Sequence, residues 1–248
     1  MFQWTLDEWI GLPIILIGIF ILTIFIKRFL KDKSNKVKSA PLKIITVIIV
    51  ALEIIKQVQS IIKGYSTWNI PLHYCSLFVF LFPLAQFGNS KLQNIVKPVA
   101  FTCALTMFSV FYIAPNLIIG DNAIIDFFDS FGKFHTVVYH HLVILYVTLS
   151  IALKDYVPKK SDFKYTITIM IIYFVIAIPC AYLLKTNYCN ILENNIPFVI
   201  PISKFVGQYI YTIGVTCVVG GGTTLISYLY YLIYDYIERK HLKTEKDL

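Results

Sequence analysis

A cysteine and a histidine lie within one short stretch, Pro71-Leu72-His73-Tyr74-Cys75-Ser76, which opens an apolar run that continues through Leu84. Proline is preorganised for the first position of a helix, so we expect a helix to begin near Ile70 or Pro71. Cys75 would then lie about one turn inside that helix, where the positive end of the helix dipole favours the nucleophilic thiolate. The alternative is that Cys75, like most unpaired cysteines of apolar helices, is a small apolar filler.

Three further histidines, His135, His140 and His141, lie together in a later apolar segment. A reactive thiol needs a neighbouring imidazole, and His73 is poorly placed because residues two apart in a helix point about 200° apart. At a rise of about 1.5 Å per residue, Cys75 would lie about 6 to 8 Å below its helix start and His140 about 10 to 12 Å below its own. The two could therefore meet, with His140 as general base. The alternative is a hydrogen-bonded interior histidine.

An amide or carboxylate that fixes the imidazole tautomer would complete a Cys-His-Asn or Cys-His-Asp arrangement. Asn187 and the aspartates at 121, 126 and 129 are the candidates for that position. The free N–H groups of the first turn, residues 71–75, could hold an oxyanion. The histidine spacings contain no i, i+4 pair and the five cysteines show no metal-binding spacing, so we expect neither a metal site nor a cofactor.

Apolar blocks separated by short basic segments make up the chain, which is 57% hydrophobic and 15% charged. Blocks of about 20 apolar residues are long enough to cross a hydrocarbon layer of about 30 Å. The composition predicts an all-α polytopic membrane protein, with residues 1–248 forming a single integral membrane domain of seven transmembrane helices. The expected spans are 8–29, 42–63, 71–87, 98–114, 133–153, 165–184 and 203–236. Because the basic residues lie between these blocks, the net charge of +8 indicates topology and no nucleic-acid partner.

The positions of the basic residues predict which way the spans run. Of the 22 Lys and Arg residues, 17 fall in the segments 27–43, 91–97, 154–164 and 239–246. By the positive-inside rule these segments are cytoplasmic, so the N-terminus is outside and the C-terminus inside. Cys75, His140 and Asn187 would then all lie towards the outer leaflet of a cell membrane, expected to be the bacterial plasma membrane.

Two patterns concern the packing of the spans. Glu53, Lys56 and Gln57 form one polar stripe at i, i+3 and i+4 within the second span. A charge inside a membrane usually faces the bundle interior, so this stripe is either a self-neutralising pair or part of a polar cavity. In the last span glycine recurs at 207, 214 and 221, a spacing that lets another helix approach along one side.

Three runs resemble one family of membrane proteins. They are WNIPLHYCSLFVFLFPLAQF (68–87), FHTVVYHHLVILY (134–146) and TNYCNILENNIP (186–197). Together they resemble the bacterial YwaF-like integral membrane family, which carries a proline and a cysteine before an apolar tail, a Tyr-His-aliphatic stretch, and an Asn-Tyr element followed by proline. That family is related to animal transmembrane proteins, one of which is regarded as an acyltransferase that uses a cysteine thioester. The resemblance implies Cys75 as the acyl-cysteine, His140 or its neighbour His141 as the family histidine, and Asn187 with Tyr188 as the Asn-Tyr element.

The function that this resemblance implies is transfer of fatty acyl chains between membrane phospholipids. An outward-facing nucleophile cannot reach cytoplasmic acyl-CoA, so a lipid would be the donor. Two other interpretations stay open. One is a small-molecule transporter or ligand-binding protein whose polar cavity is lined by Glu53 and the histidines His135, His140 and His141. The other is a structural membrane protein without chemistry. His73 stands where the relatives have other residues, which speaks against a catalytic role for it.

Overall fold

The computed structural model describes residues 5–120, 122–193 and 199–246, and the elements described there are helices and turns. The α-helices are α1 (Leu6–Phe29), α2 (Asn35–Lys38), α3 (Ala40–Ile62), α4 (Leu77–Phe87), α5 (Ser90–Ile113), α6 (Asn116–Ile119), α7 (Phe131–Ala152), α8 (Asp162–Leu184), α9 (Val199–Val206) and α10 (Gln208–Lys246). Short 3-10 turns lie at Thr67–Asn69, Tyr74–Ser76, Ile125–Phe128 and Tyr188–Asn190.

Six stretches of the described chain are long and apolar enough to cross a membrane. They are Glu8–Phe29, Asn35–Ile62, Ser90–Ile113, Phe131–Ala152, Asp162–Leu184 and Gln208–Lys240. A seventh apolar helical stretch, Tyr74–Phe87, is shorter and corresponds to the span expected at 71–87. The chain is therefore a polytopic helical membrane protein, with one of the seven expected helices too short to span by itself.

The beginning of this short helix corrects the sequence prediction. No helix begins at Ile70 or Pro71, because the backbone N–H of Leu72 bonds to the Ile70 carbonyl in a tight turn centred on Pro71. His73 is extended, with φ −72° and ψ 153°. Cys75 therefore lies in the 3-10 turn that leads into α4, and not one turn inside an established helix.

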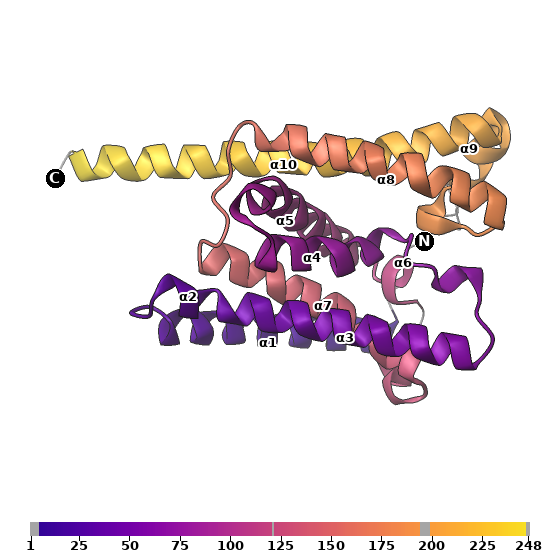
Figure 1. The fold of residues 1–248 in the computed structure, drawn as a ribbon, viewed down its shortest axis with the longest axis horizontal. Coiled ribbons are helices and arrows are strands. Elements are labelled where there is room, and N and C mark those ends of the chain that lie inside the picture. The colour runs from indigo at the N-terminus through magenta and orange to yellow at the C-terminus, as the bar shows by residue number, and fades with distance from the viewer. Residues whose placement is uncertain (1–4, 121, 194–198, 247–248) are drawn as a thin grey trace.

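The long helices run in roughly one direction and form three layers (Figure 1). The first layer holds α1 and α3, the middle layer α4, α5 and α7, and the third α8 and α10. The basic connections 30–39 and 153–161 and the C-terminal end of α10 lie at one end of the bundle (Figure 1). The connections 63–76, 114–120, 122–130 and 185–193 lie at the other end. This grouping agrees with the expected alternation of the spans, while the direction across the membrane stays a prediction.

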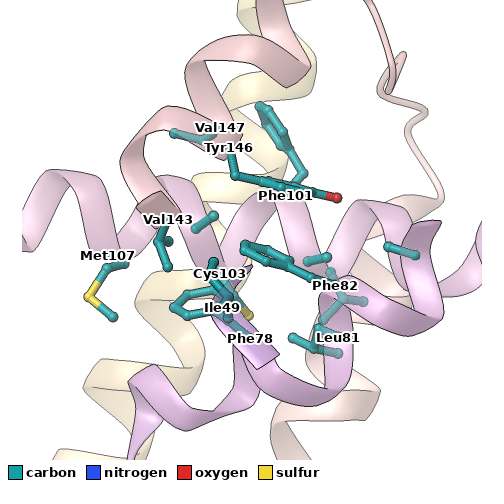
Figure 2. Close-up of a cluster of buried hydrophobic side chains, with 14 of the residues drawn as sticks. Ile49, Phe78, Leu81, Phe82, Phe101, Cys103, Met107, Val143, Tyr146 and Val147 are labelled. Atoms are coloured by element: carbon teal, nitrogen blue, oxygen red, sulfur yellow. The ribbon is translucent and has the colours of Figure 1, made fainter. Parts of the chain in front are cut away.

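The core lies around α4, which is enclosed by longer helices. Phe78 and Phe82 of α4 are fully buried and pack with side chains from α3, α5 and α7 (Figure 2). Phe82 stacks on Tyr146 of α7 with ring centroids 3.8 Å apart. Cys103 of α5 is also fully buried here, so it serves as a small apolar filler. The short helix is thereby held in a fixed position relative to α7.

The glycine pattern of the last span is used differently from the prediction. Gly207, with φ +79°, separates α9 from α10, and a Cβ at Gly214 or Gly221 would meet nothing within 4 Å. The close approach is at Gly220, where a Cβ would lie 3.3 Å from the Phe174 ring of α8. The helix contact therefore runs along a neighbouring side of α10, because the break at Gly207 ends the regular seven-residue spacing.

Candidate functional site

The Cys75 turn is attached to α7 by its main chain. The Tyr139 hydroxyl donates a hydrogen bond to the Cys75 carbonyl oxygen over 2.9 Å, and the Tyr139 side chain is only 2% exposed. The Cys75 thiol itself is half-buried, and Lys56 and Glu53 of α3 act on it electrostatically. The Cys75 turn is thus held by α7 and lies within the electrostatic range of the charged pair on α3.

His140 follows Tyr139 directly, and its tautomer is determined by the backbone. Its Nδ1 lies 2.6 Å from the Thr136 carbonyl oxygen, which can only accept, so Nδ1 carries the proton in the neutral ring. Nε2 then holds a lone pair, is buried, and has no hydrogen-bond partner among the described residues. The His140 ring stands edge-on to Tyr139 at 5.6 Å, and Lys56 acts on it electrostatically. A free imidazole base therefore lies beside the tyrosine that holds the Cys75 turn, although no hydrogen bond joins Cys75 to His140 in the described chain.

His141 has the same backbone bond but different surroundings. Its Nδ1 lies 2.7 Å from the Val137 carbonyl, and its ring packs edge-on against Phe111 of α5 at 5.1 Å. Neither Glu53 nor Lys56 is among the groups that act electrostatically on His141. Of the two adjacent histidines, His140 is therefore the one that shares Lys56 with Cys75 as a charged neighbour.

The polar stripe of α3 is present as expected. Glu53 Oε2 lies 2.8 Å from Lys56 Nζ, and Glu53 Oε1 accepts a 2.6 Å hydrogen bond from Gln57. His135 Nε2 lies 3.5 Å from Glu53 Oε2, within ion-pair distance but without the geometry of a hydrogen bond. Glu53 is only 5% exposed, so its charge is compensated locally by Lys56. His135 belongs to this ion-pair group, and Tyr139 stacks on it at 5.2 Å.

His73 faces a different group of residues from those around Cys75. Its Nε2 lies 3.2 Å from the Trp68 carbonyl oxygen, and its ring packs between Trp68 at 4.4 Å and Tyr188 at 5.2 Å. The expectation that His73 does not serve Cys75 agrees with this packing, but the reason is the extended backbone at His73 and not the helical angle. Tyr188 is fully buried and donates its hydroxyl to the Thr67 carbonyl.

Asn187, the predicted amide partner of the imidazole, is hydrogen bonded within its own loop. The side-chain oxygen of Asn187 accepts from the N–H groups of Leu192 and Glu193, and its amide donates to the Glu193 carbonyl over 2.9 Å. Asn187 thus folds the loop after α8, and the Thr136 carbonyl takes the tautomer-fixing position at His140.

The predicted aspartate partner is not formed either. Asp126 and Asp129 pair with Lys133, at 2.6 and 3.4 Å. Asp121 lies outside the described residues.

The predicted oxyanion site, formed by N–H groups of residues 71–75, stays a prediction. Of these groups, that of Leu72 is taken by the Ile70 carbonyl. The Lys56 ammonium, which acts on the thiol electrostatically, is the alternative stabiliser of negative charge. In the described part of the chain, no group of three or more His, Cys, Asp and Glu side chains is arranged to hold a metal ion.

Comparison with known proteins places the chain in a family. The family model described as the TMEM164 family matches residues 2–234, nearly the whole chain. The chain belongs to the TMEM164 family. No curated protein and no solved structure matches it.

Two residues of this TMEM164 family member were missed by the sequence reasoning. Tyr139 lies four residues after His135, so the helical period alone could have placed it on the same side of α7. Cys189 lies in the turn after α8 with φ +51°, and its sulfur interacts with the Tyr173 hydroxyl and the Tyr74 backbone. Burial raises the pKa of Cys189 to about 12, so it is held as a neutral thiol. No local sequence pattern predicts the contact between Cys189 and Tyr74, because the packing of α8 brings the Cys189 turn to Tyr74.

Proposed function

We propose that this membrane protein is a lipid acyltransferase that moves fatty acyl chains between phospholipids through an acyl-cysteine at Cys75. The observation that carries the proposal is the free, buried Nε2 lone pair of His140 next to Tyr139, which holds the Cys75 turn. A thiol beside a base with a fixed tautomer is the arrangement that nucleophilic acyl transfer needs. The enclosed Lys56–Glu53 pair supplies a positive group at the same place.

In the first half-reaction, His140 Nε2 takes the proton of the Cys75 thiol and the thiolate attacks an ester carbonyl of the donor phospholipid. The carbonyl oxygen becomes negative, and the Lys56 ammonium offsets this charge. When the C–O bond to glycerol breaks, the imidazolium returns its proton to the glycerol oxygen. A lysophospholipid leaves and the acyl chain remains on sulfur as a thioester.

In the second half-reaction, an acceptor lysophospholipid replaces the departed one. Its free hydroxyl gives a proton to His140 Nε2 and attacks the thioester carbonyl. The C–S bond breaks, and the thiolate recovers the proton from the imidazolium. One ester is lost and one is formed, so neither an external energy source nor a cofactor is required.

The first test is mass spectrometry of the protein purified in mild detergent with its native lipids, before and after neutral hydroxylamine. We expect a fatty-acyl mass on the peptide that contains Cys75, removed by hydroxylamine and absent from a Cys75→Ala variant. Cys217 is exposed on α10, so Cys217→Ala is a matched control for incidental S-acylation. A free Cys75 thiol with every phospholipid supplied would overturn the proposal.

The second test measures turnover with a labelled donor phospholipid and a lysophospholipid acceptor. We expect His140→Ala to lower the transfer rate at least about 100-fold, the usual contribution of a general base. His141→Ala, which removes an adjacent ring with the same backbone bond, should change the rate far less. Equal losses in the two variants would mean that both histidines act through stability alone.

The transporter alternative makes the opposite prediction about Glu53 and Cys75. If Glu53 binds a transported solute, Glu53→Gln abolishes uptake into proteoliposomes while Cys75→Ala leaves it unchanged. The ion pair and hydrogen bond that already occupy both Glu53 oxygens favour a packing role for this carboxylate. The same two variants, assayed for lipid transfer and for uptake, therefore separate the two functions.

A further inference from the structure

A polar cavity lies at the end of the bundle that carries the connections 63–76 and 185–193. Its volume is about 480 Å³, and its lining residues are Thr67, Trp68, Lys185, Thr186, Asn187, Leu192 and Glu193. The hydroxyls of Thr67 and Thr186 are hydrogen bonded at 2.6 Å, so the two connections are joined there. The roles described so far for Cys75 and His140 leave this cavity unused.

The two charged residues of the cavity carry opposite signs. Lys185 and Glu193 are both exposed, and neither charged group has a hydrogen-bond or ion-pair partner among the described residues. Lys185 ends α8 in the left-handed conformation, with φ +50°, a position where glycine is the usual residue. Trp68 completes the set with an aromatic ring that is 54% exposed.

We propose that this cavity binds the zwitterionic phospho-amine headgroup, phosphoethanolamine or phosphocholine, of a phospholipid whose acyl ester reaches Cys75. The phosphate of such a headgroup pairs with the Lys185 ammonium, and its amine pairs with the Glu193 carboxylate and the face of Trp68. A cation, an anion and an aromatic ring around one cavity match the charges of a zwitterion. An anionic headgroup without an amine would leave Glu193 unmatched.

The position of the cavity relative to Cys75 supports this assignment. Trp68, which lines the cavity, packs on His73 at 4.4 Å, and His73 packs on Tyr188 at 5.2 Å. Cys75 follows His73 by two residues. In a glycerophospholipid the glycerol backbone separates the headgroup from the esters in the same order. This assignment rests on the proposed acyltransferase function. In it, His73 has a packing role between the headgroup site and Cys75.

Binding is tested apart from catalysis with the Cys75→Ala protein. The protein is reconstituted into nanodiscs of equimolar phosphatidylethanolamine and phosphatidylglycerol, and its retained lipids are measured by native mass spectrometry. We expect at least a fivefold preference for phosphatidylethanolamine, falling below twofold in Glu193→Gln, whereas Lys185→Gln should lower the retention of both lipids because both carry a phosphate. Lys63→Gln removes a lysine from the same end of the bundle that does not line the cavity, and it should keep the preference.

A variant that reverses the charge at residue 193 separates loss of the site from loss of folding. In Glu193→Lys the preference should reverse towards phosphatidylglycerol, which a misfolded protein would not show. An unchanged preference in both Glu193 variants, or unchanged lipid retention in Lys185→Gln, overturns the assignment. Soluble phosphoethanolamine should compete for the site, and equal competition by inorganic phosphate would also overturn it, because the site would then recognise phosphate alone.

The two proposals fail in distinguishable ways. If lipid retention depends on Lys185 and headgroup preference on Glu193 but Cys75 is never acylated, the headgroup site stands and the acyltransferase function falls. If Cys75 is acylated but the cavity variants leave the headgroup preference of acyl transfer unchanged, the acyltransferase function stands and the headgroup site falls.

Discussion

Replacing Tyr139 by phenylalanine removes one hydroxyl and the hydrogen bond that attaches the Cys75 turn to α7. The ring stays, so its stacking on His135 and its edge contact with His140 are kept. The Cys75 carbonyl loses its 2.9 Å donor, and a buried polar group left without a partner costs about 1 to 3 kcal/mol. If about 1.4 kcal/mol of this loss frees the turn, the productive position of the thiol becomes about tenfold less populated. We therefore expect acyl transfer to fall about tenfold at unchanged lipid affinity.

Tyr146 offers a matched control on the same helix. It is also 2% exposed, and its hydroxyl accepts a 2.7 Å hydrogen bond from Gln86. Tyr146 lies seven residues from Tyr139, or about 10 Å along the helix, and away from the Cys75 turn. Tyr146→Phe should thus lose stability comparable to Tyr139→Phe, measured by thermal unfolding in detergent, and yet keep its transfer rate.

The comparison can refute the reasoning in two ways. If both variants transfer acyl chains at the same rate, the Tyr139 hydrogen bond does not position Cys75. If Tyr139→Phe loses rate only in proportion to its loss of folded protein, the bond acts on stability alone. A tenfold deficit at a temperature where both variants are fully folded is the result that the structure predicts.

Three further predictions concern the polar stripe, the glycine contact and the buried thiol. Lys56→Met should lower the free energy of unfolding by about 3 kcal/mol because it leaves the Glu53 carboxylate buried without its cation. Adding Glu53→Gln should restore most of that loss in a double-mutant cycle. Equal losses in the single and double variants would contradict a coupled pair. Gly220→Leu should destabilise the protein by about 1 to 3 kcal/mol through overpacking, whereas Gly221→Leu, which faces open space, should not, as thermal unfolding will show. A variant that keeps Cys189 as its only cysteine should react with a water-soluble maleimide at pH 8 at least about 1000-fold more slowly than an exposed cysteine. The reason is that a thiol with a pKa of about 12 is almost wholly protonated at that pH, whereas an ordinary thiol is partly ionised. The reaction rate should rise with each pH unit, and a rate near that of the exposed cysteine would refute the burial of Cys189.

The sequence was sufficient for the features that follow from local periodicity. Apolar block length predicted the helices, and six of the seven expected spans correspond to helices long enough to cross a membrane. The i, i+3 and i, i+4 spacing of Glu53, Lys56 and Gln57 predicted contacts that the structure contains. Both inferences use distances within one helix, which the backbone geometry alone determines.

The predictions that the structure changes concern segments between the long helices, where hydrogen bonds within a turn or a loop decide the conformation. The proline at 71 favours a helix start by local preference, but the preceding residue and the tight turn at Leu72 keep this segment extended. Asn187 matched a tautomer-fixing role by residue type, but its amide is used within its own loop. Local patterns cannot show which hydrogen-bond partner a polar side chain finds after the helices pack.

The unwound segment before α4 explains why so many polar side chains converge there. Residues 67–75 are not part of a continuous helix, so several of their carbonyls lack the partners that a helix would supply, and within a membrane protein such groups must be satisfied internally. Side chains from α3, α7, α8 and the connections bond to these carbonyls. The pairs are Tyr188 with Thr67, His73 with Trp68, Gln57 with Asn69, Tyr173 with Leu72, and Tyr139 with Cys75. Cys75, the proposed nucleophile at the end of this segment, is therefore held in place by side chains that bond to the backbone from several sides. The bond from Tyr139 to the Cys75 carbonyl attaches the end of this unwound segment to α7, the helix that carries His140.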